Sequence, residues 1–285
     1  MTEGTNIKVI DSVKEMQKLS NVFRKEGRTI SFVPTMGALH EGHVSLMREG
    51  KKHGDPLIAS VFVNAAQFGR NEDYNSYTRD RGGDLKKMTA AGVDIAFFPN
   101  SDEIYPPGYE TYVGVTELEK PLCGRFRPGH FRGVATVVLK LFNIVKPHVA
   151  VFGEKDYQQL QIIRKMAGDL NLELSIIGMP IIREENGLAM SSRNAYLSPE
   201  ERKKAACLSL ALREIKKSFD GGERDTVSLV RRGYEVLTRA SVSEVDYFEI
   251  RDGETLRDKE FAAPGDVAAL AVRIGSARLI DNTLL

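Results

Sequence analysis

Two histidines three positions apart, His40 and His43, are the side chains in this 285-residue sequence most suited to chemistry. They follow an apolar run that breaks at Pro34 and Gly37, and the residues after them have helical spacing. Residues three apart share one face of a helix, and the first turn of a helix has backbone N–H groups without intrahelical partners. Two imidazoles there would donate hydrogen bonds to an anion, so the segment predicts a phosphate-binding site.

The spacing of these histidines favours phosphate over zinc. A zinc-binding H-E-x-x-H helix places its two ligands four positions apart, whereas His-Glu-Gly-His is one residue shorter. The two cysteines, Cys123 and Cys207, lie far apart and have no second pair, which argues against a disulfide framework and against a structural zinc site. The sequence therefore predicts no metal site built from side chains.

A second polar stretch, Gly-Glu-Lys-Asp-Tyr-Gln-Gln over residues 153–159, follows an expected strand and opens an expected helix. This position places Lys155 and Asp156 at the same edge of a parallel sheet as the two histidines. The sequence contains neither G-x-x-x-x-G-K-[ST] nor G-x-G-x-x-G, so phosphate has to be held by other means than the usual glycine-rich loops.

A third stretch, Ser191-Ser192-Arg193, comes shortly before a strongly capped helix. Two hydroxyls and a guanidinium in succession make a phosphate clamp, because the fork of arginine matches two phosphate oxygens. Gly187, a few residues upstream, predicts a mobile approach to this clamp.

Elements that would position these side chains alternate along the first 180 residues. After an amphipathic helix over residues 13–23, the expected strands are 29–33, 57–64, 93–99, 148–152 and 172–179, and the expected helices are 42–53, 75–91, 133–146 and 157–170. Strands that are apolar throughout and alternate with helices indicate a parallel sheet covered on both faces, a Rossmann-like α/β fold. Ligands of such sheets bind at the carboxyl ends of the strands.

The pattern changes after about residue 180. Ser198-Pro199-Glu200-Glu201 supplies an N-cap, a proline at N1 and an acidic N3 residue for a helix to about residue 219, and Asp225 caps another helix. Residues 245–250, 267–274 and 277–281 alternate apolar and polar side chains, as in a half-exposed antiparallel sheet. We expect an N-terminal Rossmann-like domain over residues 1–181 and a smaller α+β lid domain over residues 182–285.

Composition excludes several classes of protein. Forty basic side chains against 39 acidic ones leave a net charge of +1, so no global field recruits nucleic acid or an anionic membrane. The longest apolar stretch, residues 134–145, is too short to span a bilayer, and the first thirty residues contain no signal-peptide core. With a hydrophobic content of 42% and only two cysteines, the chain is expected to fold without disulfide or metal cross-links, in a reducing cytoplasm.

Taken together, these stretches resemble the pantothenate synthetase (pantoate–β-alanine ligase) family of the nucleotidyltransferase superfamily. The segments that carry the resemblance are residues 35–43, Phe62-Val63-Asn64, Gln67-Phe68-Gly69, 153–159 and 189–194. The resemblance extends over nearly the whole chain. Residues 153–159 and 188–194 are specific to the family, whereas H-x-G-H marks only the superfamily.

The resemblance implies a ligase that forms an amide bond in two steps. ATP and D-pantoate would give an enzyme-bound pantoyl adenylate and pyrophosphate, and β-alanine would then attack the acyl carbon to give pantothenate and AMP. Mg²⁺ is expected on the phosphates, held mainly by ATP and water. The resemblance also implies a homodimer through the N-terminal domain, to which residues 123–131 would contribute.

Site residues are implied by the same resemblance, position by position. Those implied to be catalytic are His40, His43, Lys155, Ser191, Ser192 and Arg193. The ATP contacts would be Met36, His40, His43, Gly153, Lys155, Asp156, Ile182, Met190, Ser191, Ser192 and Arg193, and the pantoate contacts Met36, Asn64, Gln67, Tyr77 and Gln159. Uncharged glutamines suit a carboxylate that must remain nucleophilic, since a fixed cation beside it would lower its basicity.

The chain departs from the family pattern at two turns. It reads Asn64-Ala65-Ala66-Gln67 where the family usually has Asn-Pro-Thr-Gln or Asn-Pro-Met-Gln, and Tyr77-Thr78-Arg79 where Tyr-Pro-Arg is usual. Because proline fixes φ, we expect an intact fold and ATP site but weaker pantoate binding. Two alternatives stay open: another adenylyltransferase that accepts a phosphate monoester, and a nucleotide-binding protein impaired in turnover by the altered loop.

Overall fold

The computed structural model describes residues 7–70 and 72–285. They form two compact units that are not continuous in sequence. The N-terminal unit contains the described residues up to 115 together with 129–154 and 162–180, and the C-terminal unit contains 116–128, 155–161 and 181–285. The expected division into domains of residues 1–181 and 182–285 stays a prediction.

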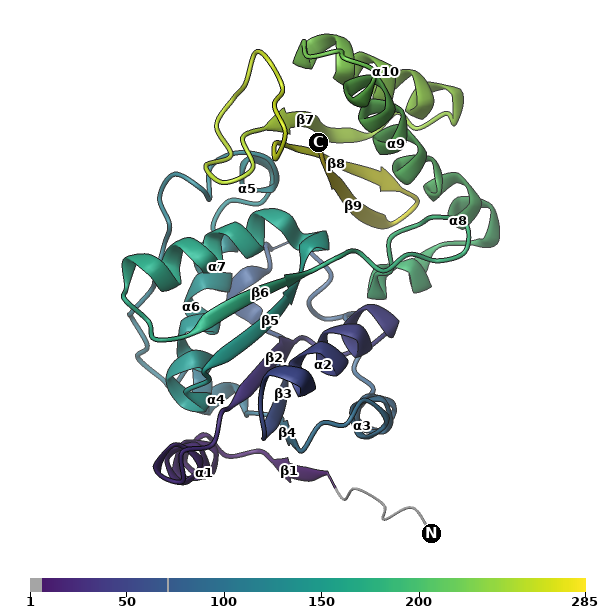
Figure 1. Ribbon diagram of the computed structural model, residues 1–285. Helices are drawn as coiled ribbons and strands as arrows, with labels where there is room; N and C mark the ends of the chain where they lie inside the picture. Colours follow the sequence, from purple (N-terminus) through teal and green to yellow (C-terminus); the bar gives the residue numbers. More distant parts are fainter. Residues whose placement is uncertain (1–6, 71) are drawn as a thin grey trace. The chain divides into compact units, whose positions relative to one another are not determined.

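A parallel sheet of six strands forms the centre of the N-terminal unit (Figure 1). Its order is β1-β4-β3-β2-β5-β6, with the bounds β1 (Lys8–Ile10), β2 (Ser31–Thr35), β3 (Leu57–Val61), β4 (Ile95–Phe97), β5 (Val149–Gly153) and β6 (Ser175–Met179). The predicted parallel α/β class is confirmed. The sequence reasoning missed β1, because a three-residue edge strand with two exposed side chains has no clear hydrophobic period.

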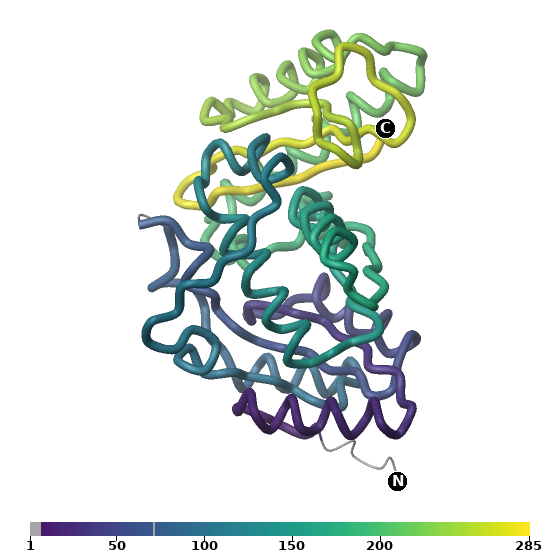
Figure 2. The backbone as a smooth tube through the Cα atoms, turned by 90° about the vertical axis from the view of Figure 1, so that its left-hand side faces the viewer, coloured from purple at the N-terminus to yellow at the C-terminus, as the bar shows by residue number. Residues whose placement is uncertain are grey.

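Helices cover both faces of this sheet (Figure 1). The longer ones are α1 (Val13–Lys25), α2 (Glu41–His53), α3 (Arg81–Ala90), α6 (His130–Val145) and α7 (Tyr157–Asp169), and a short one is α4 (Ser101–Ile104). The short helix α5 (Cys123–Phe126) belongs to the C-terminal unit. Helix α2 packs on one face, and α1 and α6 lie beside one another on the other, as the tube in Figure 2 shows. Phe142 of α6 makes edge-on contacts with Phe32 of β2 and Phe152 of β5, at centroid distances of 6.4 and 6.3 Å.

Local chemistry explains where two helices begin differently from expectation. Helix α3 begins at Arg81 instead of residue 75, because the Asp80 carboxylate accepts the N–H of Gly83 as an N-cap. Helix α6 begins at His130, three residues earlier than expected, after Gly129 with a left-handed φ of 80°.

The order of the strands creates a switch point between β2 and β5. From β2 the chain adds β3 and β4 on one side, and it later returns to add β5 and β6 on the other side. Loops that leave such neighbouring strands in opposite directions open a crevice at their carboxyl ends, where ligands of doubly wound sheets bind. The two predicted site segments after residues 35 and 153 leave these two strands.

The C-terminal unit combines helices with a three-stranded antiparallel sheet of order β7-β8-β9. Its elements are a 3₁₀ turn η3 (Ser192–Tyr196), α8 (Pro199–Ala205), α9 (Cys207–Asp220), α10 (Thr226–Arg239), β7 (Val245–Arg251), β8 (Val267–Ile274) and β9 (Ala277–Leu284). The predicted caps form: Ser198 accepts the N–H of Glu201 at 3.2 Å, and Asp225 accepts that of Ser228 at 2.7 Å. The helix expected to run to residue 219 is two helices, α8 and α9, that meet at Ala206.

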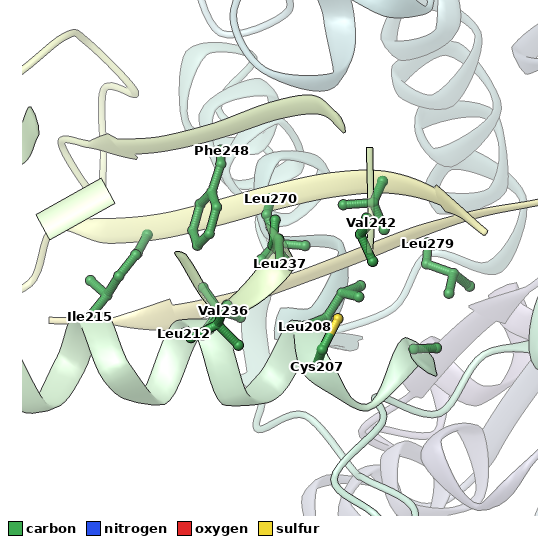
Figure 3. Packing of buried hydrophobic residues seen from close by; sticks show 14 of the residues in the cluster. Cys207, Leu208, Leu212, Ile215, Val236, Leu237, Val242, Phe248, Leu270 and Leu279 are labelled. Atoms are coloured by element: carbon green, nitrogen blue, oxygen red, sulfur yellow. The ribbon is translucent and has the colours of Figure 1, made fainter. Parts of the chain in front are cut away.

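The core of this unit lies between α9, α10 and the sheet (Figure 3). Leu212 and Ile215 of α9 pack with Leu237 of α10, Phe248 of β7 and Leu270 of β8. The expectation of a half-exposed sheet is wrong for β8, whose side chains are buried from residue 267 to 272. As the central strand, β8 has neighbours on both edges. In the described part of the chain, no helix is long and apolar enough to cross a membrane.

Candidate active site

The two histidines lie where β2 turns into α2. Gly37 and Ala38 make this turn with positive φ angles of 85° and 51°, His40 is the N-cap of the helix, and His43 follows in its first turn. The structure brings the two imidazoles together, with ring centroids 4.1 Å apart and an angle of 41° between the planes. His43 Nδ1 accepts the backbone N–H of His40 at 3.3 Å. In a neutral ring that hydrogen bond places the proton on Nε2, which makes Nε2 a donor.

A buried carboxylate that the sequence reasoning missed supports this turn from α3. Asp84, only 2% exposed, accepts the backbone N–H groups of Ala38 at 3.1 Å and Leu39 at 2.8 Å. Lys87, one turn later on α3, donates to the Leu39 carbonyl at 2.5 Å. Burial raises the pKa of Asp84, and the two backbone N–H groups oppose that rise. A Cβ on Gly37 would come within 2.9 Å of the Asp84 carboxylate, so the turn requires glycine there.

The predicted pantoate residues Met36, Asn64 and Gln67 also meet in the N-terminal unit. The Gln67 amide donates to Met36 Sδ at 3.2 Å, and its oxygen accepts from the Asn64 amide at 3.0 Å. Asn64 is 1% exposed, and its oxygen accepts the Ala66 N–H and the hydroxyl of Tyr105 at 2.8 Å. Asn64 therefore orients Gln67 in addition to any direct role.

Helix α6 holds the 3₁₀ turn η1 (Ala65–Gln67) in place. Asn64 donates to the Gly133 carbonyl at 3.1 Å, and His130 Nδ1 lies 2.7 Å from the carbonyl oxygen of Gln67. A Cβ on Gly133 would overlap the Ala66 carbonyl group, so only glycine allows this approach. These contacts join positions more than sixty residues apart, and the sequence contained no local signal for them.

Two further predicted residues differ in their surroundings. Tyr77 is buried, and its ring makes an edge-on contact with Phe68 at 6.0 Å, which places it beside the residue after Gln67. Gly153 ends β5, and a Cβ there would meet no atom within 4 Å. Open space next to a backbone is what a ligand needs in order to approach it closely.

The remaining predicted residues belong to the C-terminal unit. Lys155 and Asp156 lie in the 3₁₀ turn η2 (Glu154–Asp156), with Lys155 Nζ 3.7 Å from the Asp156 carboxylate. The Lys155 side chain is 20% exposed. Gln159 is half-buried, whereas its neighbour Gln158 is buried and bonds to the backbone of Leu118, Pro121 and Cys123. Of the two glutamines, Gln158 therefore has a structural role.

A hairpin over residues 182–190 leads to the Ser191-Ser192-Arg193 clamp. Its two strands bond through Met190 N–H to the Ile182 carbonyl at 2.9 Å, and Gly187 turns the chain with φ of 91°. Ser191 caps η3 by accepting the Arg193 N–H at 3.3 Å. The predicted adenine contacts, Ile182 and Met190, are thus cross-strand neighbours directly before the clamp.

A buried polar network that the sequence reasoning missed holds the clamp. Asn194, 3% exposed, donates to Glu184 Oε1 at 2.7 Å and to the Ala189 carbonyl at 3.1 Å. The guanidinium of Arg202 on α8 binds both oxygens of Glu184, at 2.7 and 2.8 Å. This network joins the start of the hairpin to the residue after Arg193.

The described residues contain no preformed set of side-chain ligands for a metal ion. Over residues 7–70 and 72–285, no group of three or more His, Cys, Asp or Glu side chains is arranged to hold a metal ion. The predicted phosphate-binding residues instead carry imidazole, hydroxyl, ammonium and guanidinium groups, which suit an anion.

Comparison with known proteins agrees with this chemistry. A sequence model described as pantoate–β-alanine ligase matches residues 8–284. The chain is 54% identical over 279 residues to the pantothenate synthetase of Geobacter sulfurreducens, covering 98% of this chain and 99% of that protein. It is 50% identical to the pantothenate synthetase of Thermotoga neapolitana over 279 residues, covering 98% of this chain and all of that protein.

Solved structures give the same result. The pantothenate synthetase of Thermus thermophilus superposes with a TM-score of 0.92 at 42% identity, covering 97% of this chain and 99% of that one. The pantoate–β-alanine ligase of Francisella tularensis, solved in complex with β-γ ATP and β-alanine, superposes with a TM-score of 0.80 at 33% identity over 98% of both chains.

Proposed function

The chain belongs to the pantoate–β-alanine ligase family, and from this premise we propose how its own residues perform the reaction. It is an ATP-dependent ligase that condenses D-pantoate with β-alanine to pantothenate, AMP and pyrophosphate. In the first step a pantoate carboxylate oxygen bonds to the α-phosphorus as the bond to pyrophosphate breaks. In the second, the β-alanine amine bonds to the acyl carbon, loses a proton and displaces AMP.

The paired imidazoles carry this proposal. His40 and His43 stand at the N-terminus of α2, at the carboxyl end of β2, with their rings 4.1 Å apart. In-line displacement at phosphorus requires position and donors aimed at developing negative charge, more than a protein nucleophile. We assign both imidazoles to the ATP phosphates, where the Nε2–H of neutral His43 donates without a change of protonation state.

The cationic groups of the C-terminal unit are assigned to the rest of ATP. Lys155, Ser191, Ser192 and Arg193 neutralise the triphosphate as pyrophosphate leaves. Gly153 and Asp156 hold the ribose hydroxyls, and the backbone near Ile182 and Met190 holds the adenine. The open space at Gly153 and the half-exposed carboxylate of Asp156 support the ribose assignment.

Pantoate is assigned to the amide groups. Gln67 and Gln159 hydrogen-bond its carboxylate and hydroxyls, Met36 packs beside it, and Asn64 and Tyr77 complete its surroundings. The bonds from Asn64 to Gln67 and from Gln67 to Met36 support this grouping. Neutral donors orient the carboxylate and leave it nucleophilic.

Mg²⁺ accompanies ATP in this proposal. It would be held by phosphate oxygens and water, and it would supply charge neutralisation on the triphosphate. The donors of this chain fit that arrangement, because imidazole, hydroxyl, ammonium and guanidinium groups would bind the phosphates and leave the ion to phosphate oxygens and water. We also propose a homodimer formed through the expected N-terminal domain, residues 1–181, and a cytoplasmic location. Sedimentation equilibrium of the purified chain tests the dimer, and a monomer across the micromolar range would contradict it.

Substrate dependence tests the proposed reaction. With ATP and Mg²⁺, pyrophosphate should form when pantoate is added, and AMP with pantothenate should accumulate only when β-alanine is present as well. Pyrophosphate formation that prefers a phosphate monoester to pantoate would instead indicate another adenylyltransferase. ATP binding without turnover would indicate that the altered loop at residues 64–67 has inactivated the enzyme.

A further inference from the structure

Strand β9 of the C-terminal unit bonds directly to the backbone of Lys155. The side-chain amide of Asn282 donates to the Lys155 carbonyl oxygen at 2.9 Å, and Asn282 itself is 6% exposed. The two residues are 127 positions apart in sequence. The bond is partly buried, so loss of the donor would leave the carbonyl less well satisfied, and the bond holds the turn in one position.

The preceding residue of β9 holds the other phosphate-binding segment. Asp281, with a side chain 1% exposed, forms two bonds to the Arg183 guanidinium, at 2.6 and 2.9 Å. Arg183 also donates to the Gly187 carbonyl at 3.1 Å, so its side chain fastens both strands of the hairpin over residues 182–190. The hairpin leads directly to the Ser191-Ser192-Arg193 clamp.

Consecutive residues of a strand point to opposite faces of its sheet. Asp281 and Asn282 therefore reach different segments from a single piece of backbone, whose position is fixed by the pairing of β9 with β8. Resting on the proposed function of Lys155 and the clamp, we propose that Asp281 and Asn282 are positioning residues for the triphosphate: they keep Lys155 and the 182–193 segment in fixed register, so that both act on the same phosphates.

The turn has a second attachment that makes the role of Asn282 testable. Tyr157 lies two residues after Lys155, and its hydroxyl donates to the Gly253 carbonyl at 2.8 Å. Loss of the Asn282 amide therefore leaves the segment attached through Tyr157 and removes the constraint at the Lys155 carbonyl. Thr283 is a matched control, because it lies next on β9 and its hydroxyl bonds only to the neighbouring Leu284 carbonyl among the contacts described.

The test is a double-mutant cycle of Asn282→Ala and Lys155→Ala in the full-length chain, with Thr283→Ala as control. The readouts are pantoate-dependent pyrophosphate release and the dissociation constants of a β,γ-nonhydrolysable ATP and of AMP. We expect Asn282→Ala to slow pyrophosphate release about tenfold and to weaken binding of the ATP analogue. Binding of AMP should not change, because AMP lacks the β- and γ-phosphates. The double variant should be no slower than Lys155→Ala, because Asn282 acts through Lys155.

Other outcomes would contradict either the proposed function of Lys155 or the proposed role of Asn282. If Lys155→Ala leaves release and analogue affinity unchanged, the proposed function of Lys155 is wrong. If Lys155→Ala is impaired but Asn282→Ala matches Thr283→Ala, or if the two losses add, the role of Asn282 is wrong. An equal loss of AMP affinity would indicate a general structural role and would also overturn it. Asn282→Ser, whose hydroxyl is too short to reach Lys155, replaces the alanine variant if that one does not fold.

A second cycle tests Asp281 in the same way. Asp281→Asn keeps the shape of the side chain and removes its charge, and it is combined with Arg193→Ala. The losses in pyrophosphate release should again fail to add, and AMP affinity should stay unchanged. Additive losses would show that Asp281 does not act through the clamp.

Discussion

His43 has two different hydrogen-bonding nitrogens, and this difference defines its chemistry. Nδ1 accepts the His40 backbone N–H at the start of α2, so a neutral ring carries its proton on Nε2. A donor fixed by the backbone needs no reorganisation when charge develops on phosphate, which is the usual source of a large rate effect. The identity and spacing of the histidines could be read from the sequence, but this hydrogen bond could not.

Replacing His43 with alanine should slow pantoate-dependent pyrophosphate release by about a hundredfold or more, the effect of losing one transition-state donor. Stopped-flow detection of pyrophosphate under single-turnover conditions measures this step alone. His53→Ala, at the other end of the same helix, is the control and should keep the normal rate. A near-normal rate for His43→Ala would contradict its assigned role.

The altered loop after Asn64 can accept proline. Asn64 has φ of −83° and ψ of 102°, an extended conformation that suits a residue before proline, and Ala65 is the first residue of η1. Ala65→Pro should therefore lower the pantoate KM and leave the ATP KM unchanged, because it restricts the free conformations of a loop that holds Gln67. Steady-state kinetics with each substrate varied in turn measures both constants. An unchanged pantoate KM would show that the missing proline has no effect on binding.

At the scale of the element, the turn between β2 and α2 depends on α3. Asp84 accepts two backbone N–H groups of the turn and Lys87 donates to its carbonyl. Together they fix residues with positive φ just before the two histidines proposed to bind phosphate. Asp84 would therefore affect the reaction indirectly, by holding the backbone of the turn that positions the two histidines.

Asp84→Asn should reduce kcat/KM for pyrophosphate release about tenfold and lower the unfolding free energy by about 1–3 kcal/mol, because an amide presents one oxygen and an N–H where two acceptors are needed. Urea denaturation and the half-reaction assay give the two quantities. Glu41→Gln, which removes an exposed carboxylate on the first turn of α2, serves as the comparison and should leave both unchanged. Equal behaviour of the two variants would contradict the role of Asp84.

Helices, caps and the parallel sheet were predictable because their signals are local. Ser198 and Asp225 are N-caps as expected, and the alternation of apolar strands with amphipathic helices identified the fold class. The residues that position the site were not predictable. Asp84, Gly133 and Asn282 contact segments 45, about 66 and 127 positions away, and no periodicity or capping pattern encodes such pairs.

At the scale of the whole molecule, the residues proposed for the site belong to both compact units. The histidines and Gln67 belong to the N-terminal unit, whereas Lys155 and the clamp belong to the C-terminal unit. Sequence position suggested that Lys155 belongs with the parallel sheet because it directly follows β5. The bond from Asn282 of β9 to the Lys155 carbonyl, and the bond from Tyr157 to the loop after β7, explain why this turn groups with the C-terminal sheet instead.

The buried thiol of Cys207, in the core of the C-terminal unit, should make the unfolding free energy depend on pH. Burial raises the pKa of this thiol to about 11, with Lys204 opposing the rise. Because the folded pKa lies above the unfolded one, the native state holds the proton more tightly, and the unfolding free energy should fall as pH rises from about 9 to 11. Urea titrations across this range should show the slope, and Cys207→Ala should flatten it. An identical slope in both proteins would contradict the burial of this thiol.

The central claim is that the pantoate carboxylate attacks the α-phosphorus of ATP. Pantoate labelled with ¹⁸O in its carboxylate tests it directly, because the attacking oxygen stays on phosphorus when β-alanine displaces AMP. After turnover with ATP and β-alanine, mass spectrometry should find one ¹⁸O in AMP and none in pyrophosphate. Unlabelled AMP, or label in inorganic phosphate with release of ADP, would contradict an adenylate and the assignments built on it.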